Sequence, residues 1–111
     1  MVIVCGVLTG LNKGAFYNCS ALTSVVIPNS VTSIGGYTFN GCSSLQTVFY
    51  TGTAEQWNDI SIGYNGYLTN ATRYYYSETE PALNESGTAY AGNYWHYALD
   101  GKTPVIWKKE N

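Results

Sequence analysis

The chain has 111 residues, the length of a single domain, and its charged residues make up only 11%, against about 25% in an ordinary soluble domain. A formal net charge of −2 argues against a nucleic-acid-binding protein, which carries a basic patch, and against a binder of anionic membranes, which clusters Lys and Arg. Hydrophobic residues make up 45%, which argues against disorder, and no apolar run approaches the roughly 18 residues of a membrane-spanning helix.

The start of the chain, residues 1–6, has neither a basic segment nor a long apolar stretch, so it does not form a signal peptide. These residues instead look like the middle of a repeat, and we expect the chain to be the C-terminal part of a longer protein. Residues 2–4 are expected to form an unpaired strand edge, which invites edge-to-edge pairing with a second copy.

Apolar residues and cysteines recur at an interval of 23 residues. The matching pairs are Phe16 and Phe39, Cys19 and Cys42, Leu22 and Leu45, Val25 and Val48, and Ile27 and Tyr50. The same interval places Val2 on Val25, Val4 on Ile27, Leu11 on Ile34, Trp57 on Ile34, Ile62 on Phe39, Leu68 on Leu45 and Ala71 on Val48. The period predicts a half coil (2–11), two regular coils (12–34 and 35–57) and a degenerate coil (58–76), which bury their apolar faces only by stacking.

Within a coil, the pattern alternates as in a strand with one buried face. Val25 and Ile27 are expected to point inward, and Pro28 ends the strand because it has no N–H for the ladder. Val31 and Ile34 supply inward side chains on the return leg. Residues 35–36, both glycine, are expected to turn the corner with positive φ, and residues 15–19 form a single 3₁₀ or α turn.

The stretch 14–48, GAFYNCSALTSVVIPNSVTSIGGYTFNGCSSLQTV, resembles the BspA-like leucine-rich repeat, and the match extends over about residues 2–50. Thr38 stands where the family has Ala, and residues 50–51 stand where it has Ile-Pro. The resemblance implies a right-handed leucine-rich-repeat solenoid of 23-residue coils, built mostly of short β-strands with 3₁₀ or short helical turns. It also implies display on a bacterial cell surface, or secretion, and binding of host or neighbouring-cell proteins.

The second half of the chain holds eleven of the twelve charged residues. Residues 53–60 are predicted to form a short helix with Thr53 as its N-cap and with Trp57 and Ile60 facing inward. Residues 68–76 are predicted to continue as a last strand. The polar and acidic segment 77–92 is predicted to be a loop.

Residues 93–111 are predicted to hold a β-hairpin that caps the open end of the solenoid. The pair Asp100–Gly101 favours a two-residue type I′ turn, which places Trp95 opposite Ile106 and residue 97 opposite residue 104. The proline at 104 suits an edge strand.

The chain offers no catalytic constellation, no metal site and no cofactor-binding motif. The single histidine, His96, lies in the hairpin without a partner nucleophile and is expected to be structural. Cys19 and Cys42 are expected to be buried free thiols rather than a redox pair, because stacked side chains point in parallel, and Cys5 is out of step with both.

Three functions stay open at this stage. The first is a non-enzymatic adhesion module that binds a protein through the concave sheet, with contacts from Thr23, Ser24, Val26, Gln46, Thr47 and Phe49. The second is a carbohydrate or cell-wall binder that uses the exposed aromatics Tyr75, Trp95 and Trp107. The third is a structural cap of a longer solenoid that binds nothing.

Overall fold

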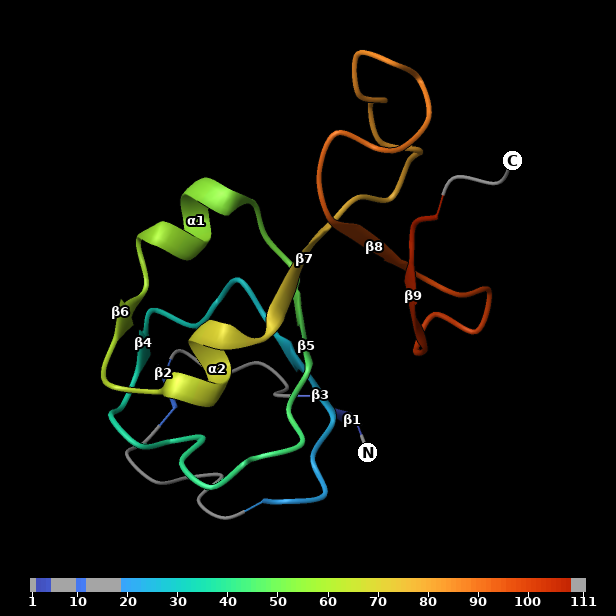
Figure 1. Ribbon diagram of the computed structural model, residues 1–111. Helices are drawn as coiled ribbons and strands as arrows, with labels where there is room; N and C mark the ends of the chain where they lie inside the picture. Colours follow the sequence, from blue (N-terminus) through green and yellow to red (C-terminus); the bar gives the residue numbers. More distant parts are fainter. Residues whose placement is uncertain (1, 5–9, 12–18, 109–111) are drawn as a thin grey trace.

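The computed structural model describes residues 2–4, 10–11 and 19–108 of the chain, and the side chains of residues 19–108. The described residues form short strands and two short helices (Figure 1). The strands are β1 (Val2–Val4), β2 (Gly10–Leu11), β3 (Ser24–Ile27), β4 (Ser33–Ile34), β5 (Thr47–Tyr50), β6 (Ser61–Ile62), β7 (Thr72–Tyr76), β8 (Tyr94–Tyr97) and β9 (Pro104–Ile106). The helices are α1 (Ala54–Asn58) and α2 (Gly66–Asn70).

Alternate strands along the chain belong to two different sheets. The larger sheet has the order β1-β3-β5-β7-β8-β9, and its neighbours are parallel except for the antiparallel pair β8 and β9. The smaller sheet has the order β2-β4-β6 and is parallel. From β1 to β7 the chain passes from one sheet to the other and back, which stacks coils into a solenoid-like fold. The right-handed sense of the coiling stays a prediction.

The repeat register is confirmed between β3 and β5. Val25 pairs with Val48, and Ile27 pairs with Tyr50, in each case 23 positions further along the chain. Leu11 in β2 pairs with Ile34 in β4 at the same interval. Equivalent backbone positions of successive coils therefore lie side by side, as a repeat that stacks must place them.

The register of β1 corrects the prediction by one residue. Val2 pairs with Ser24 rather than with Val25, and Val4 pairs with Val26 rather than with Ile27. The stretch from β1 to β2 is one residue shorter than the stretch from β3 to β4, so a strict period misplaces the first strand.

The third coil also departs from the predicted period. Ile34 pairs with Ile62 rather than with Trp57, so Ile62 does not take the position of Phe39. Val48 pairs with Arg73 rather than with Ala71. The cause is the segment that contains α1, which lengthens the path from β5 to β6 and moves every later residue out of the period of 23.

Helix α1 confirms the predicted helix and its N-cap Thr53, but it ends at Asn58 rather than at residue 60. The Thr53 hydroxyl accepts the N–H of Gln56 at 3.2 Å, and the Gln56 side chain accepts the N–H of Thr53 at 2.9 Å. This reciprocal pair is a capping box, and it satisfies two backbone donors that a helix start otherwise leaves open. Trp57 and Ile60 are buried, as predicted. A helix this short is unstable alone, so its anchoring in the core is what holds it.

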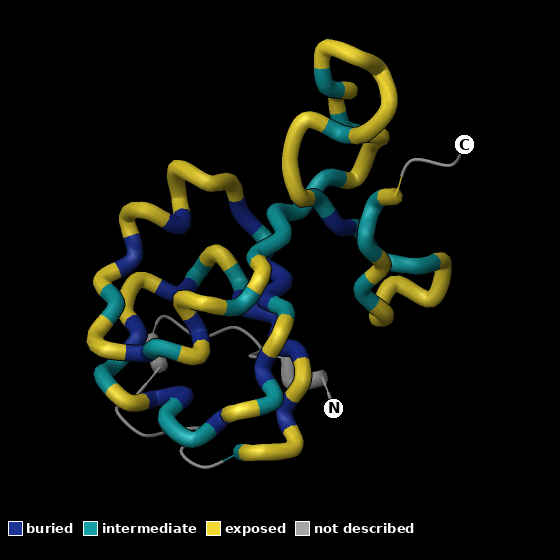
Figure 2. Tube along the Cα trace, viewed as in Figure 1, coloured by how far each residue is buried: buried dark blue, intermediate teal, exposed yellow. Residues whose placement is uncertain are grey.

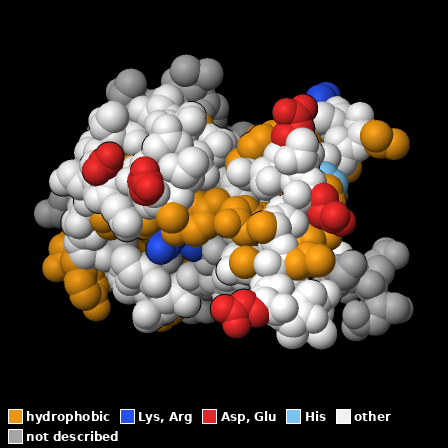
Figure 3. Space-filling model, turned by 90° about the horizontal axis from the view of Figure 1, so that it is seen from above, with side chains coloured by type: hydrophobic (Ala, Val, Ile, Leu, Met, Phe, Trp, Pro, Cys, Tyr) orange, Lys and Arg blue, Asp and Glu red, His pale blue; other side chains and the backbone are white. Residues whose placement is uncertain are grey.

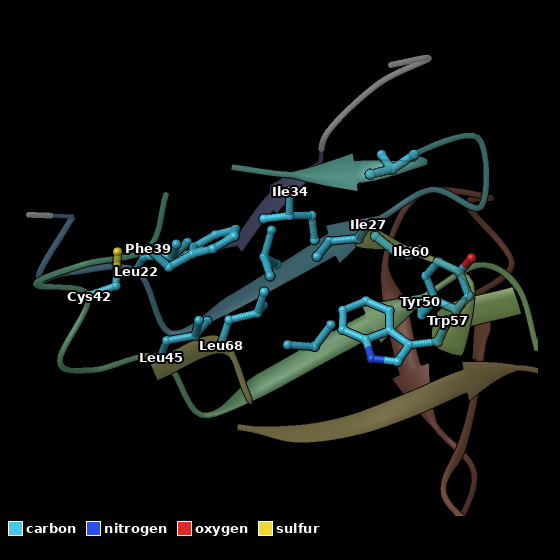
Figure 4. Close-up of a cluster of buried hydrophobic side chains, with 13 residues drawn as sticks. Leu22, Ile27, Ile34, Phe39, Cys42, Leu45, Tyr50, Trp57, Ile60 and Leu68 are labelled. Atoms are coloured by element: carbon cyan, nitrogen blue, oxygen red, sulfur yellow. The ribbon is translucent and has the colours of Figure 1, made fainter. Parts of the chain in front are cut away.

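The main core lies between the two sheets (Figure 4). Its labelled members are Leu22, Ile27, Ile34, Phe39, Cys42, Leu45, Tyr50, Trp57, Ile60 and Leu68. Phe39 and Cys42 come from a turn in which the Cys42 N–H donates to the Phe39 carbonyl at 3.1 Å, a 3₁₀-type bond. This is the turn predicted for the equivalent residues 15–19, of which 15–18 lie outside the described residues.

Two turns differ from prediction in their backbone angles. At the corner after β4, positive φ falls on Tyr37 (φ 61°) rather than on the glycines at 35 and 36. In the hairpin, only Gly101 has positive φ, so the turn is not type I′, which needs positive φ at Asp100 as well. The Asp100 carboxylate instead accepts bonds from the Thr103 hydroxyl and from the N–H groups of Lys102 and Thr103, and these bonds lower the pKa of Asp100.

The hairpin register is confirmed, because Trp95 pairs with Ile106 and Tyr97 with Pro104. Its first strand, β8, lies beside β7, so the hairpin extends the larger sheet by two strands and Pro104 lies on the edge strand. The segment 77–92 stands away from the coils (Figure 1) and is mostly exposed (Figure 2). The role of the hairpin as a cap stays a prediction.

Candidate functional site

The larger sheet has one face toward the main core and one face away from it, and we call the second face the outer face. It corresponds to the concave face of the sequence prediction. Because side chains alternate along a strand, every second residue points there. Among the residues with described side chains, the strand residues of the outer face are Ser24, Val26, Thr47, Phe49, Thr72, Tyr74, Tyr76, Trp95, Tyr97, Pro104 and Ile106. None of them carries a formal charge at neutral pH.

The six predicted contact residues are brought together on β3 and β5 and just before them. The N–H groups of Gln46 and Thr47 both donate to the carbonyl of Thr23, at 2.9 and 3.3 Å. Thr23 and Gln46 are exposed and Thr47 is half-buried, whereas the other three, Ser24, Val26 and Phe49, are buried. As ligand contacts, these six residues stay a prediction.

The two apolar members of this set, Val26 and Phe49, form a second buried cluster with Trp95. The Trp95 ring lies 5.3 Å from the Phe49 ring, between centroids, and is fully buried. Its indole N–H donates to the Tyr50 carbonyl at 2.7 Å, which locks the hairpin onto β5. The sheet face is therefore filled at this point by the protein's own tryptophan.

Three tyrosines pack against this buried cluster on the outer face. Tyr76 and Tyr97 lie 5.2 and 4.8 Å from the Trp95 ring, and Tyr74 lies 6.0 Å from the Phe49 ring. All three are half-buried, so part of each ring faces solvent. Burial raises the pKa of the Tyr97 phenol, with a smaller contribution from Tyr76, so the group stays uncharged well into the alkaline range.

The outer face thus has two adjoining zones. The polar zone is the row Ser24, Thr47 and Thr72, with Gln46 beside it. The aromatic zone is formed by Tyr74, Tyr76 and Tyr97 over the buried cluster. Figure 3 looks down on the molecule from above Figure 1, and at this end hydrophobic side chains gather in a band across the middle, with Lys or Arg atoms directly beside it and acidic side chains scattered around it.

The three residues of the alternative aromatic site lie in different environments. Tyr75 is half-buried on the core side of β7, where its hydroxyl accepts the Arg73 Nε–H at 2.9 Å. Trp95 is fully buried on the outer face, so it has no surface to offer a ligand. Trp107 is half-buried, its ring 4.3 Å from His96, and its indole N–H donates to the Ser77 carbonyl at 2.8 Å. As a joint binding site, these three residues stay a prediction.

A hollow of about 450 Å³ lies beside Trp107. Tyr74, Tyr90, Asn93 and Lys108 line it together with residues 88–89, 92 and 106. The Tyr90 hydroxyl donates to Glu80 at 3.0 Å, and the Tyr90 ring meets the Trp107 ring edge-on at 6.1 Å. The rings that border this hollow are therefore largely engaged with one another.

The two cysteines and the histidine, which are the candidates for redox chemistry or catalysis, lie in packed surroundings. Cys19 and Cys42 form no disulfide bond; Cys42 is buried as predicted, whereas Cys19 is half-buried. Burial raises the pKa of the Cys42 thiol, which makes the reactive thiolate scarce. His96 packs against Trp107, and its Nδ1 lies 2.9 Å from the Tyr97 carbonyl. No group of three or more His, Cys, Asp or Glu side chains in the described part of the chain is arranged to hold a metal ion.

Sequence reasoning missed the contribution of Tyr74, Tyr76 and Tyr97 to the outer face. The signal was present, since alternation from Phe49 and its partner Tyr74 leads along β7 to Tyr76 and then to Trp95. The period of 23 keeps these residues on the same face, because Ala71 and Arg73 are two positions apart, but it places Thr72 rather than Tyr74 beside Phe49. The Arg73 guanidinium also lies over the Trp57 ring, 4.7 Å from its centroid, and no sequence motif predicted this contact.

A family model described as BspA type leucine rich repeat region (6 copies) matches residues 7–73, more than half of the chain. The chain belongs to this family. The resemblance carried by residues 14–48 is thereby confirmed. No curated protein and no solved structure gave a significant match.

Membership in the BspA-type family indicates a protein-interaction module. The family is generally non-enzymatic, and its members are typically cell-surface proteins. Within the described residues, no helix has the length and apolar character needed to cross a membrane.

Proposed function

We propose that this BspA-type repeat is a non-enzymatic adhesion module at the bacterial cell surface, which binds a protein of a host or neighbouring cell through the outer face of its larger sheet. The observation that carries the proposal is the composition of that face. An uncharged row of Ser and Thr adjoins half-exposed tyrosines that rest on a packed cluster.

This combination of tyrosines and neutral polar residues is typical of protein–protein interfaces. Tyr is enriched at energetic hot spots, where large rings are held in place and ringed by neutral contacts. The Trp95 ring and its bond to Tyr50 fix the tyrosines around it, so little side-chain entropy remains to be lost on binding. The lack of charge predicts a slow, weakly salt-dependent association rather than an electrostatically steered one.

The hairpin and its edge strand support a second, structural part of the proposal. We infer that the hairpin within residues 93–111 closes the C-terminal end of the array, because Pro104 removes a backbone donor from the last strand. Such an edge pairs poorly with a further strand.

The test is a binding panel of extracellular-matrix and cell-surface proteins, read by surface plasmon resonance on the purified chain. Thr72→Glu places a charge in the polar zone, and Ser61→Glu places the same charge at an exposed strand position of the smaller sheet. We expect Thr72→Glu to weaken binding about tenfold or more, and Ser61→Glu to leave it unchanged.

Two results contradict the proposal: no protein of the panel binds saturably, or Thr72→Glu binds as well as Ser61→Glu. Phe49→Ala is a poor probe of the surface, because Phe49 is buried and its removal tests the fold instead. Matching far-UV circular dichroism and melting midpoints for the two Glu variants establish that a loss of binding is local.

A further inference from the structure

A second aromatic hollow lies on the side of the coils, between the two sheets and apart from the outer face. It has a volume of about 350 Å³ and is lined by Asn40, Tyr64, Gly66, Tyr67 and Asn70. Asn40 lies in the turn between β4 and β5, Tyr64 lies just before α2, and the other lining residues lie in α2. The volume falls at the lower end of the range of small-molecule sites.

The backbone that carries this hollow is fixed by one buried side chain. Asn65 is 3% exposed, and its amide donates to the carbonyls of Gly35 and Gly63, at 3.1 and 2.9 Å. Its side-chain oxygen accepts the Phe39 N–H at 2.9 Å. One asparagine thus ties together the two turns that border the hollow.

A strained residue supports the same edge. Tyr37 has φ 61°, a conformation that a bulky residue adopts only where its surroundings impose it. Its N–H donates to the Tyr64 carbonyl at 2.7 Å, and the two rings lie 5.8 Å apart. Strain of this kind is concentrated at functional sites, and the bond that accompanies it here holds the Tyr64 backbone beside the hollow.

The lining combines accessible rings with open amides. Tyr64 is 71% exposed and Tyr67 is 43% exposed, in contrast to the packed rings of the outer face. Within the described residues, the side-chain amides of Asn40 and Asn70 make no hydrogen bond, and the lining contains no charged group. Each amide offers both donors and an acceptor.

We propose that this hollow binds a neutral hexopyranose unit of a polysaccharide. The apolar C–H face of a pyranose ring stacks on a tyrosine ring, while its vicinal hydroxyls both donate and accept, as an asparagine amide does. An acidic sugar finds no cation here, and an apolar ligand leaves the amides of Asn40 and Asn70 unsatisfied. The hollow beside Trp107 is a weaker candidate, because the Tyr90 hydroxyl and the Trp107 N–H are already bonded.

The test is isothermal titration calorimetry of the full chain with cellohexaose, laminarihexaose and mannohexaose, and with hexagalacturonic acid as an acidic counterpart. We expect saturable binding of at least one neutral hexasaccharide and none of the acidic one. Tyr64→Ala and Asn70→Ala are each expected to weaken binding about tenfold, whereas Tyr64→Phe keeps the ring and the affinity.

Tyr90→Ala is the matched control, since it removes a tyrosine ring from the other hollow. Thr72→Glu separates this site from the outer face and is expected to leave sugar binding unchanged. The proposal is overturned if no neutral hexasaccharide binds at millimolar concentration, if the acidic one binds better, or if Tyr90→Ala and not Tyr64→Ala abolishes binding. Equal melting midpoints of the variants confirm that the comparison is between folded proteins.

Discussion

The hydrogen bond from Trp95 to Tyr50 is expected to anchor the hairpin to the coils, and its contribution to the free energy of unfolding can be measured. Trp95→Phe keeps an aromatic ring in the buried cluster but removes the indole N–H that donates to the Tyr50 carbonyl at 2.7 Å. Losing a buried donor costs about 1–3 kcal/mol, and the smaller ring leaves a void that adds to this. We expect Trp95→Phe to lower the free energy of unfolding by about 2–3 kcal/mol, a large share of the roughly 5–15 kcal/mol of a domain.

Urea unfolding followed by far-UV circular dichroism measures this loss, because that signal reports mainly the backbone and, unlike tryptophan fluorescence, does not rely on the replaced residue. The midpoint should fall while the slope of free energy against urea stays the same. Trp107→Phe is the matched control: its indole N–H also donates to a carbonyl, that of Ser77 at 2.8 Å, but the ring is only half-buried. A hydrogen bond at such a site contributes about 0.5–1.5 kcal/mol. If Trp95→Phe costs no more than Trp107→Phe, the bond to Tyr50 does not anchor the hairpin.

Three further predictions concern the coils. Gly63→Ala should destabilise the fold by about 1–3 kcal/mol in urea unfolding, because its Cβ would lie 2.5 Å from the backbone nitrogen of Gly36, whereas Gly36→Ala meets no atom closer than 3.7 Å and should be tolerated. Thr53→Ala removes the hydroxyl that accepts the Gln56 N–H and should cost about 1 kcal/mol, while Thr53→Ser should restore most of it. Burial raises the pKa of the Cys42 thiol in the folded state above its unfolded value of roughly 8.5. The stability that comes from keeping this thiol protonated is therefore complete below the unfolded pKa and is lost as the pH rises through the folded pKa. The urea midpoint of the wild type should fall at alkaline pH more than that of Cys42→Ala.

Sequence reasoning predicted the parts of the fold whose structure is determined by one local pattern. The 23-residue match of Val25 with Val48 fixes the register of β3 and β5, because apolar residues on one face must stack. Thr53 and Gln56 mark the start of α1, and the hairpin register follows from a turn centred on residues 100–101. In each case the responsible residues are close in sequence or related by the repeat.

The parts that sequence reasoning missed depend on contacts between distant segments. A fixed period cannot show that residues around α1 displace β6 and β7, so Arg73 instead of Ala71 lies beside Val48. Alternation assigned Phe49 to the outer face but could not tell that Trp95, 46 positions later, covers it. The positive φ of Tyr37 likewise follows from its bond to Tyr64 and not from its own side chain.

Arg73 changes the character of the row of paired residues that faces the main core. In the row of paired residues Val25, Val48 and Arg73, the last position points toward the main core, where a third apolar residue would continue the column and require a further coil. The guanidinium instead lies over the rings of Trp57 and Tyr75, at 4.7 and 5.7 Å, so the column ends in a cation that remains half-exposed. Two aromatic side chains of β8, Trp95 and Tyr97, lie on the opposite face of the sheet. There they form a cluster with Val26 and Phe49, and the hairpin thereby determines which rings the outer face presents.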